Sequence, residues 1–223
     1  MNIISIIPAR GGSKGVPKKN IKKFLDKPLV AHTIEYSLSS KLVTETYVTT
    51  DDSEIKNISE KYNAKVIDRP KRISGDGATT ESAIEHALQN IDIEPDIIIL
   101  LQPTSPFRPN NSIDNAIIHF IKNNYDSLLS LSPTHNFIWN VSNGIAKPNH
   151  EFLNRPRRQD IKINDINFIE NGSLYIFKKS NFNKYRNRLG GKIGYVIFDE
   201  KYSIEIDTKL DFFILEEISK RFN

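Results

Sequence analysis

The chain has 223 residues, of which 38% are hydrophobic and 26% are charged, and it contains no cysteine. These fractions are typical of a globular domain and exclude a disordered chain, a collagen and a disulfide scaffold. The absence of cysteine excludes a thiolate nucleophile, an iron–sulfur cluster and a cysteine-ligated zinc site. We therefore expect one domain over residues 1–223, with a hydrophobic core of its own.

No apolar run in the sequence reaches the roughly 18 residues that a membrane-spanning helix needs. The first residues also lack the positively charged start and the long apolar stretch of a secretory signal. We therefore expect a cytoplasmic protein that has no membrane partner.

The net charge of +4 is concentrated near the start of the chain. Residues 1–30 hold seven basic side chains against one acidic side chain, whereas the remainder holds 24 basic and 26 acidic ones. Such a segment is typical of a nucleic-acid-binding arm or of a pocket for a small polyanion. An arm would need aromatic platforms or a basic helix, and only Phe24 lies nearby. We therefore favour a small polyanion and expect no nucleic-acid partner.

Short apolar runs alternate with helix-like patterns through the first 131 residues. The runs predict strands over residues 3–7, 46–49, 65–67, 97–101 and 127–131. The spacing of apolar residues predicts helices over residues 29–38, 53–62, 81–88 and 112–122. The expected helix caps are Asp51, Asp52 or Ser53, then Thr79 or Thr80. The alternation predicts an α/β fold with a doubly wound, mostly parallel, Rossmann-like sheet.

The pattern loosens in the last 90 residues. Residues 133–170 are rich in Asn, Pro and Arg, and we expect them to form an excursion off the sheet. Residues 178–192, with the pair Gly190 and Gly191, predict a second excursion. Further strands are expected over 174–177 and 195–197, and a final helix over 210–222 with Thr208 as its cap.

The loop after the first expected strand has the composition of an anion-binding site. Residues 8–20 read Pro-Ala-Arg-Gly-Gly-Ser-Lys-Gly-Val-Pro-Lys-Lys-Asn. Glycines let backbone N–H groups approach an anion, arginine offers a bidentate fork, and lysine offers a point charge. In open α/β sheets, ligands bind beyond the carboxyl ends of the strands, where this loop lies. The spacing matches neither the dinucleotide fingerprint nor the P-loop, so a turn beside solvated lysines is the alternative interpretation.

Residues 7–15, followed by Lys19 and Asn20, resemble the signature loop of the acylneuraminate cytidylyltransferases, the CMP-sialic acid synthetases and their relatives. The resemblance continues in order through residues 50–52, 69–70, 101–108, 157–159, 171–176 and 203–208. It implies a nucleotidyltransferase that joins CTP to a nine-carbon 2-keto-3-deoxy sugar acid and releases pyrophosphate. It also implies Mg²⁺ as cofactor and a homodimer, with residues 133–170 contributing to the dimer interface and the sugar site.

The resemblance implies which residues bind CTP. The triphosphate is expected to contact Arg10, Ser13, Lys19 and Asn20, with room and N–H donors supplied by Gly11 and Gly12. The cytosine is expected to contact Arg69, Ala78 and Thr80. Lys19, with Arg10 and Asp207, is the catalytic candidate, because charge at the α-phosphate must be stabilised during transfer.

The resemblance also implies a sugar site and a metal site. The sugar acid is expected to contact Gln102, Arg158, Asn171 and Tyr175, some of them contributed across the dimer. Mg²⁺ is expected to bind Asp207, whereas Glu205 is left open as a ligand because the family usually has Asp-x-Asp there. Carboxylate oxygens are the ligands that this hard cation prefers.

Two further features bear on the substrate. Gln102 separates the chain from the related 3-deoxy-octulosonate cytidylyltransferases, which carry an acidic residue there. The stretch between Arg158 and Asn171 is longer than in the simpler sialate pattern, which favours a diacetamido acid such as legionaminate or pseudaminate. The alternatives are a cytidylyltransferase for a different keto-deoxy acid, such as 3-deoxy-octulosonate, and a non-catalytic nucleotide-binding relative.

Overall fold

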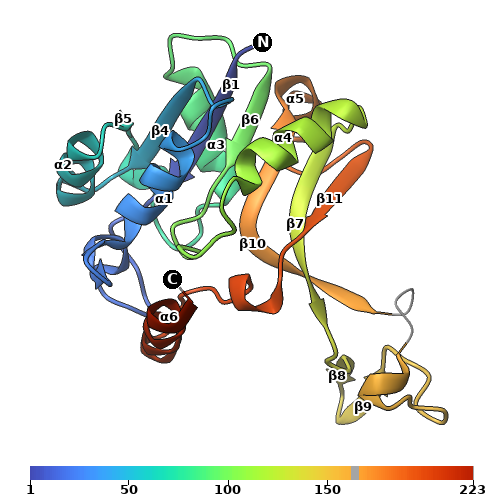
Figure 1. Ribbon diagram of the computed structural model, residues 1–223. Coiled ribbons are helices and arrows are strands. Elements are labelled where there is room, and N and C mark those ends of the chain that lie inside the picture. Colours follow the sequence, from blue (N-terminus) through green and yellow to red (C-terminus); the bar gives the residue numbers. More distant parts are fainter. Residues whose placement is uncertain (162–165, 223) are drawn as a thin grey trace.

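The computed structural model describes residues 1–161 and 166–222, except for the side chains of Arg158 and Phe222. A seven-stranded sheet forms its centre (Figure 1). In spatial order the strands are β11 (Ile193–Ile197), β7 (Ser127–Thr134), β10 (Asn167–Lys178), β6 (Ile97–Leu100), β1 (Ile3–Pro8), β4 (Glu45–Thr50) and β5 (Lys65–Asp68). Only β10 runs antiparallel to its neighbours, so the predicted mostly parallel sheet is confirmed.

Helices cover both faces of the sheet, as a doubly wound fold requires. The helices are α1 (Leu29–Leu38), α2 (Ser53–Lys61), α3 (Thr80–Gln89), α4 (Ser112–Lys122), α5 (Lys179–Tyr185) and α6 (Lys209–Phe222). One hydrophobic cluster joins the sheet to α1, α2 and α4, and a second joins the opposite face to α3 and α5. None of the helices in the described chain combines the length and hydropathy that crossing a bilayer requires.

Three predicted helix caps are confirmed. Asp52 accepts hydrogen bonds from the first-turn N–H groups of α2, and Thr79 accepts one from Ser82 N in α3. Thr208 Oγ1 accepts one from Asp211 N at 3.2 Å in the first turn of α6. Each cap satisfies a backbone donor that the helix itself cannot pair, and so fixes where the helix begins.

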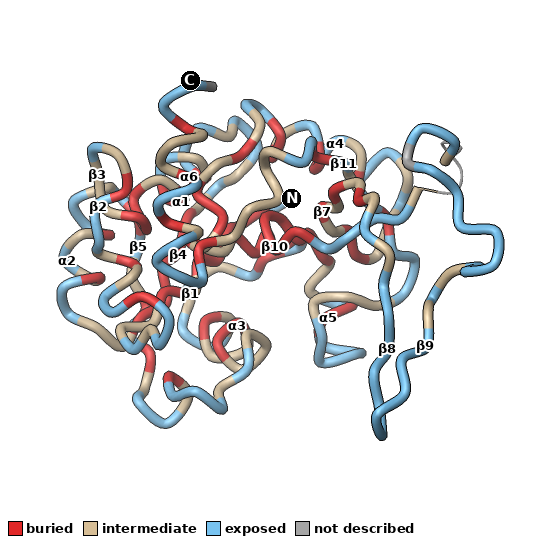
Figure 2. The backbone as a smooth tube through the Cα atoms, turned by 90° about the horizontal axis from the view of Figure 1, so that it is seen from below, coloured by how far each residue is buried: buried red, intermediate tan, exposed pale blue. Residues whose placement is uncertain are grey.

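The excursion of residues 133–170 grows out of two strands of the sheet. Strands β7 and β10 run on past the sheet, and between them lies the hairpin of β8 (Trp139–Ser142) and β9 (Ile145–Pro148). Figure 2 shows this hairpin as an exposed arm beside the buried centre of the sheet. The prediction for residues 174–177 was too short, because β10 spans twelve residues and carries a register shift between Glu170 and Tyr175.

The second predicted excursion, residues 178–192, is wrong. Residues 179–185 form α5, which packs on the sheet instead of leaving it. Phe182 is buried, and its ring lies 5.6 Å from that of Phe177 in β10. One aromatic side chain is enough to hold this short helix against the sheet, because its burial removes a large apolar area from water.

Candidate active site

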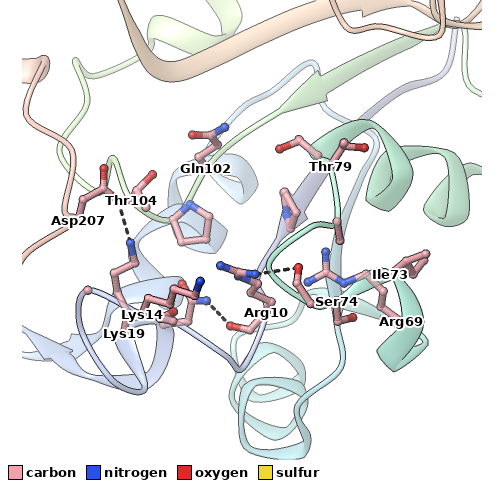
Figure 3. Close-up of a pocket in the computed structure, with 18 residues that line it drawn as sticks. Arg10, Lys14, Lys19, Arg69, Ile73, Ser74, Thr79, Gln102, Thr104 and Asp207 are labelled. Carbon is pink, nitrogen blue, oxygen red and sulfur yellow. Dashed lines mark hydrogen bonds and ion pairs between the residues drawn. The ribbon is translucent and has the colours of Figure 1, made fainter.

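A cleft of about 490 Å³ lies at the carboxyl ends of β1, β5 and β6 (Figure 3). It brings together nine of the predicted site residues: Arg10, Ser13, Lys19, Asn20, Arg69, Ala78, Thr80, Gln102 and Asp207. Lys14 also lines this cleft. Gly11, Gly12, Asn171, Tyr175 and Glu205 are not among its lining residues, and the side chain of Arg158 lies outside the described part of the chain.

The first loop closes against residues 74–78 through its basic side chains. Arg10 Nη1 donates to Gly75 O at 2.9 Å and lies 3.1 Å from Asp76 Oδ1. Lys14 Nζ lies 2.8 Å from the other carboxylate oxygen of Asp76. These cations hold the pKa of Asp76 below its ordinary value. Sequence reasoning missed Asp76, although its place between Gly75 and Gly77 marks a turn.

Two glycines of the loop are required by close packing. A Cβ at Gly11 would lie 2.7 Å from Asp52 Oδ2, and a Cβ at Gly15 would collide with the backbone carbonyl of Asp207. Gly12 has open space around it. The N–H of Gly11 donates to Asp51 Oδ1 at 3.0 Å, so it is already paired in this structure. The predicted role of Gly11 and Gly12 in binding triphosphate stays a prediction.

Lys19 connects the first loop to the C-terminal segment. It lies in the 3-10 turn η1 (Lys19–Ile21), where Asn20 Nδ2 donates to Arg10 O at 2.9 Å. Lys19 Nζ donates to Ile206 O at 2.6 Å and to Asp207 Oδ1 at 3.1 Å. Only 12% of the Lys19 side chain is exposed, whereas Asp207 is exposed at the cleft. The ammonium group of Lys19 is therefore held in a fixed position beside the exposed carboxylate of Asp207.

Arg69 follows β5 and is 8% exposed. Its backbone N–H donates to Thr50 O at 2.7 Å, but its Nε and Nη2 find no hydrogen-bond partner among the described residues. Burial lowers the pKa of this guanidinium. Unpaired buried donors are costly, and a ligand that accepts from them recovers that cost. Arg69 is thus suited to bind a polar ligand in the cleft.

Gln102 is held in place by a buried arginine to which the sequence analysis assigned no role. Arg108 Nη2 donates to Gln102 O at 2.7 Å, and Arg108 Nε donates to Ser173 O at 3.2 Å. Its Nη1 donates to Thr33 Oγ1 at 3.2 Å. Burial lowers the pKa of Arg108 to about 10. Arg108 therefore ties the loop after β6 to β10 and α1, behind the cleft.

The two predicted sugar residues of β10 are engaged in internal bonds. Asn171 Nδ2 donates to Ser132 Oγ at 3.0 Å, and Asn171 Oδ1 accepts from Ser130 Oγ and from Ser173 N. These bonds use three of the four hydrogen-bonding positions of the amide. The Tyr175 hydroxyl donates to Glu170. The predicted contacts of Asn171 and Tyr175 with a sugar stay predictions.

Asp207 and Glu205 are the residues that could hold Mg²⁺. They are two residues apart in the chain, and burial and the charge of Asp207 raise the pKa of Glu205 to about 7. The Glu205 carboxylate packs on Gly172, where a Cβ would collide with it. No larger His or acidic cluster in the described chain could hold a metal by itself. The pair fits Mg²⁺, which takes few protein carboxylates and fills its other positions with water and phosphate oxygens.

Comparison with known proteins assigns the chain to the family that its sequence motifs resemble. Residues 4–220 match the cytidylyltransferase family. An N-acylneuraminate cytidylyltransferase from Escherichia coli O18:K1:H7 is 33% identical over 99% of this chain and 53% of its own length. A CMP-N,N'-diacetyllegionaminic acid synthase from Legionella pneumophila is 40% identical over 141 residues, which cover 60% of this chain and 59% of that protein.

A solved structure of CMP:2-keto-3-deoxy-manno-octonic acid synthetase complexed with CTP has a TM-score of 0.72 at 14% identity. It covers 99% of both chains, and at this identity it shows the fold alone. The chain spans about half the length of the N-acylneuraminate cytidylyltransferases that it matches. The match across residues 4–220 and the identity to these relatives show that the chain belongs to the cytidylyltransferase family.

Proposed function

We propose that the chain transfers CMP from CTP to a nine-carbon 2-keto-3-deoxy sugar acid and releases pyrophosphate. The observation that carries the proposal is the cleft. Lys19 pairs with Asp207 on one side of it, and on another side lies Arg69, whose Nε and Nη2 have no partner among the residues that the structure describes. Fixed cations suit a triphosphate, and buried donors without a partner suit a base edge. A solvated surface would not hold a lysine and an arginine this deeply.

The reaction is an in-line displacement at phosphorus. The anomeric hydroxyl oxygen of the sugar acid forms a bond to the α-phosphorus and releases its proton to water. The bond between the α-phosphorus and the bridging oxygen breaks, and pyrophosphate leaves with that electron pair. Lys19 stabilises the charge on the α-phosphate oxygens. Arg10 and Lys14 release their ion pairs with Asp76 and form ion pairs with the outer phosphates instead. Mg²⁺, held by Asp207 and Glu205, would neutralise charge on the triphosphate.

The sugar acid is proposed to have nine carbons. The names of the sequence relatives refer to acylneuraminate and to diacetyllegionaminic acid, and Gln102 lies in the cleft where an eight-carbon enzyme is expected to carry an acid. The long segment between Arg158 and Asn171 favours a diacetamido acid over N-acetylneuraminate. An eight-carbon acid is the second candidate, because the solved structure of similar fold is named for one.

A homodimer in the cytoplasm is part of this proposal. The excursion of residues 133–170 exposes several large apolar side chains that a lone domain would leave in water: Ile138, Trp139, Val141, Ile145, Phe152 and Leu153. A second copy of the chain that covers this excursion would bury them. Light scattering on a sizing column is expected to give twice the chain mass, and Val141→Glu to shift the protein toward monomer. A wild-type monomer at micromolar concentration would contradict the dimer.

The proposed activity is tested by pyrophosphate release with CTP and Mg²⁺. The acids to offer are N-acetylneuraminate, diacetamido nonulosonates and 3-deoxy-octulosonate, each repeated with UTP, ATP and GTP. Release that requires CTP and one nine-carbon acid is the expected result. Release with 3-deoxy-octulosonate alone would favour the eight-carbon alternative, and folded protein that binds CTP without turnover would favour a non-catalytic relative.

A further inference from the structure

Four charged or polar side chains form a compact cluster beside the cleft. Arg188, in the loop between α5 and β11, donates from Nη1 to Glu81 Oε1 at 2.5 Å. Its Nη2 lies 3.7 Å from Glu170 Oε1, and its Cζ lies 4.6 Å from the centre of the Tyr175 ring. The cluster thus joins α3, β10 and the loop after α5. None of its four members lines the cleft itself.

The cluster adjoins the predicted sugar end of the cleft. Tyr175 pairs with Leu100, the last residue of β6, and Gln102 lies two residues further along the chain. Glu81 directly follows Thr80, which lines the cleft. Figure 3 places Gln102 and Thr79 along one edge of the cleft, across from Arg10 and Ser74. A sugar acid that contacts Gln102 would therefore extend toward the cluster.

Arg188 determines which polar groups are accessible to a ligand at this end of the cleft. Tyr175 is only 2% exposed; the guanidinium lies over its ring, and its hydroxyl donates a hydrogen bond to Glu170. The groups that remain accessible are Arg188, Glu81 and the half-exposed Glu170. Arg188 covers the Tyr175 ring, so Arg188 would make the contact with the sugar acid that was expected of Tyr175.

The charges of the cluster select the kind of group it can bind. One guanidinium and two carboxylates give an excess of negative charge, which repels the carboxylate of a sugar acid. A neutral acylamino group, which donates through its N–H and accepts through its carbonyl, fits such a set. Arg188 Nε is also buried without a hydrogen-bond partner among the described residues, so it can donate to an acyl carbonyl.

We propose that Arg188 is a specificity-determining residue that, with Glu81 and Glu170, binds the acylamino substituents of the sugar acid. The inference rests on the proposed function and adds to it the group that is recognised. Arg188 makes the cluster select acylated acids because a ring hydroxyl does not reach as far as an acyl carbonyl, so an acid with a hydroxyl in that place would leave Arg188 Nε without an acceptor.

The test compares Arg188→Ala and Arg188→Lys with Arg186→Ala. Arg186 is a matched control, because it also pairs with α3, through Glu85 at 2.5 Å, and bonds to neither Tyr175 nor Glu170 in the described structure. Each protein is assayed with an acetamido nine-carbon acid and with the matched acid that has a hydroxyl instead. Calorimetry measures the binding of CTP, and of each acid in the presence of a non-hydrolysable CTP analogue.

We expect Arg188→Ala to raise KM for the acetamido acid and to reduce its preference over the hydroxyl acid by at least about tenfold. CTP affinity should stay unchanged, Arg188→Lys should restore only part of the preference, and Arg186→Ala should behave as wild type. An unchanged preference in Arg188→Ala would overturn the inference and leave the proposed function standing. Wild-type protein that neither binds nor turns over any nine-carbon acid would overturn both.

Discussion

The proposed nucleotide end of the cleft and the proposed sugar end, whose side chains lie beside the cleft, differ in how their polar groups are paired. At the nucleotide end, two buried donors of Arg69 have no partner in the described part of the chain, and Asp207 is exposed. At the sugar end, Asn171, Tyr175 and Arg188 are bonded to other side chains of the protein. The base of a nucleotide at the first end fills donors that are already open, and its outer phosphates displace one internal partner, Asp76, whereas a sugar acid at the second end must share or replace several internal bonds. The nucleotide end is therefore the more preorganised of the two.

The largest effect is expected from Lys19→Ala at the nucleotide end. Loss of a fixed charge aimed at the transition state costs about 10²–10³-fold in kcat. Lys18→Ala is the matched control, because Lys18 is its neighbour in sequence and pairs with Glu54 on the exposed surface. Steady-state kinetics of both variants measure the difference. Equal losses in the two would show that general positive charge, not the placement of Lys19, matters.

Gly15→Ala should have the next largest effect. The added Cβ collides with the carbonyl of Asp207 and must displace the segment that carries it, at a stability cost of about 1–3 kcal/mol. We expect a lower Tm and a weaker response to Mg²⁺. Gly12→Ala serves as the control, since its Cβ meets open space and the Tm should hold. The same Tm for both variants would contradict the close packing of the first loop on Asp207.

The variant Arg69→Met distinguishes a role of Arg69 in CTP binding from a role in the stability of the ligand-free protein. Removing the buried guanidinium deletes two unpaired donors, so the free protein should unfold at the same or a higher denaturant concentration. CTP affinity should fall by about tenfold or more, because the base loses a charged hydrogen-bond donor. Urea titration and calorimetry give the two quantities. Marked destabilisation of the ligand-free protein would mean that Arg69 has a structural role instead.

The smallest effect is a pH dependence from Glu205. In the folded protein its pKa is about 7, raised by burial and by Asp207, and in the unfolded chain it is the ordinary 4.5. Between these values the folded state holds a proton that the unfolded state has lost, so stability falls as pH rises through this window. Urea unfolding without Mg²⁺ at about pH 5 and pH 8 should therefore show a steeper decline in wild type than in Glu205→Gln. Parallel declines would contradict the raised pKa.

The difference between the nucleotide end and the sugar end also explains which parts of the fold and the site could be predicted from the sequence. The central strands were predictable because β6 is an unbroken apolar run and β1 is interrupted only by Ser5, as is typical of buried parallel strands. The anion-binding loop was predictable because glycine and basic residues are adjacent in the chain. Most of the predicted CTP residues do meet in one cleft.

The sugar end was harder to predict because it is assembled from distant segments. Arg188 and Glu81 are 107 residues apart, and no local pattern links them. Strand β10 was predicted too short because polar residues such as Glu170 and Asn171 interrupt its apolar pattern, where the register also shifts. Helix α5 was missed because Phe182 is its only fully buried apolar residue, too few to show a helical period.

The most direct test of the account is calorimetric titration of CTP into the free protein with Mg²⁺, with UTP and ATP titrated in parallel. Because the nucleotide end is preorganised around Arg10, Lys19 and Arg69, we predict that CTP binds without a sugar acid and more tightly than UTP or ATP. Folded protein that binds no CTP, or that binds all three nucleotides equally, would contradict the central claim that this cleft is a cytidine triphosphate site.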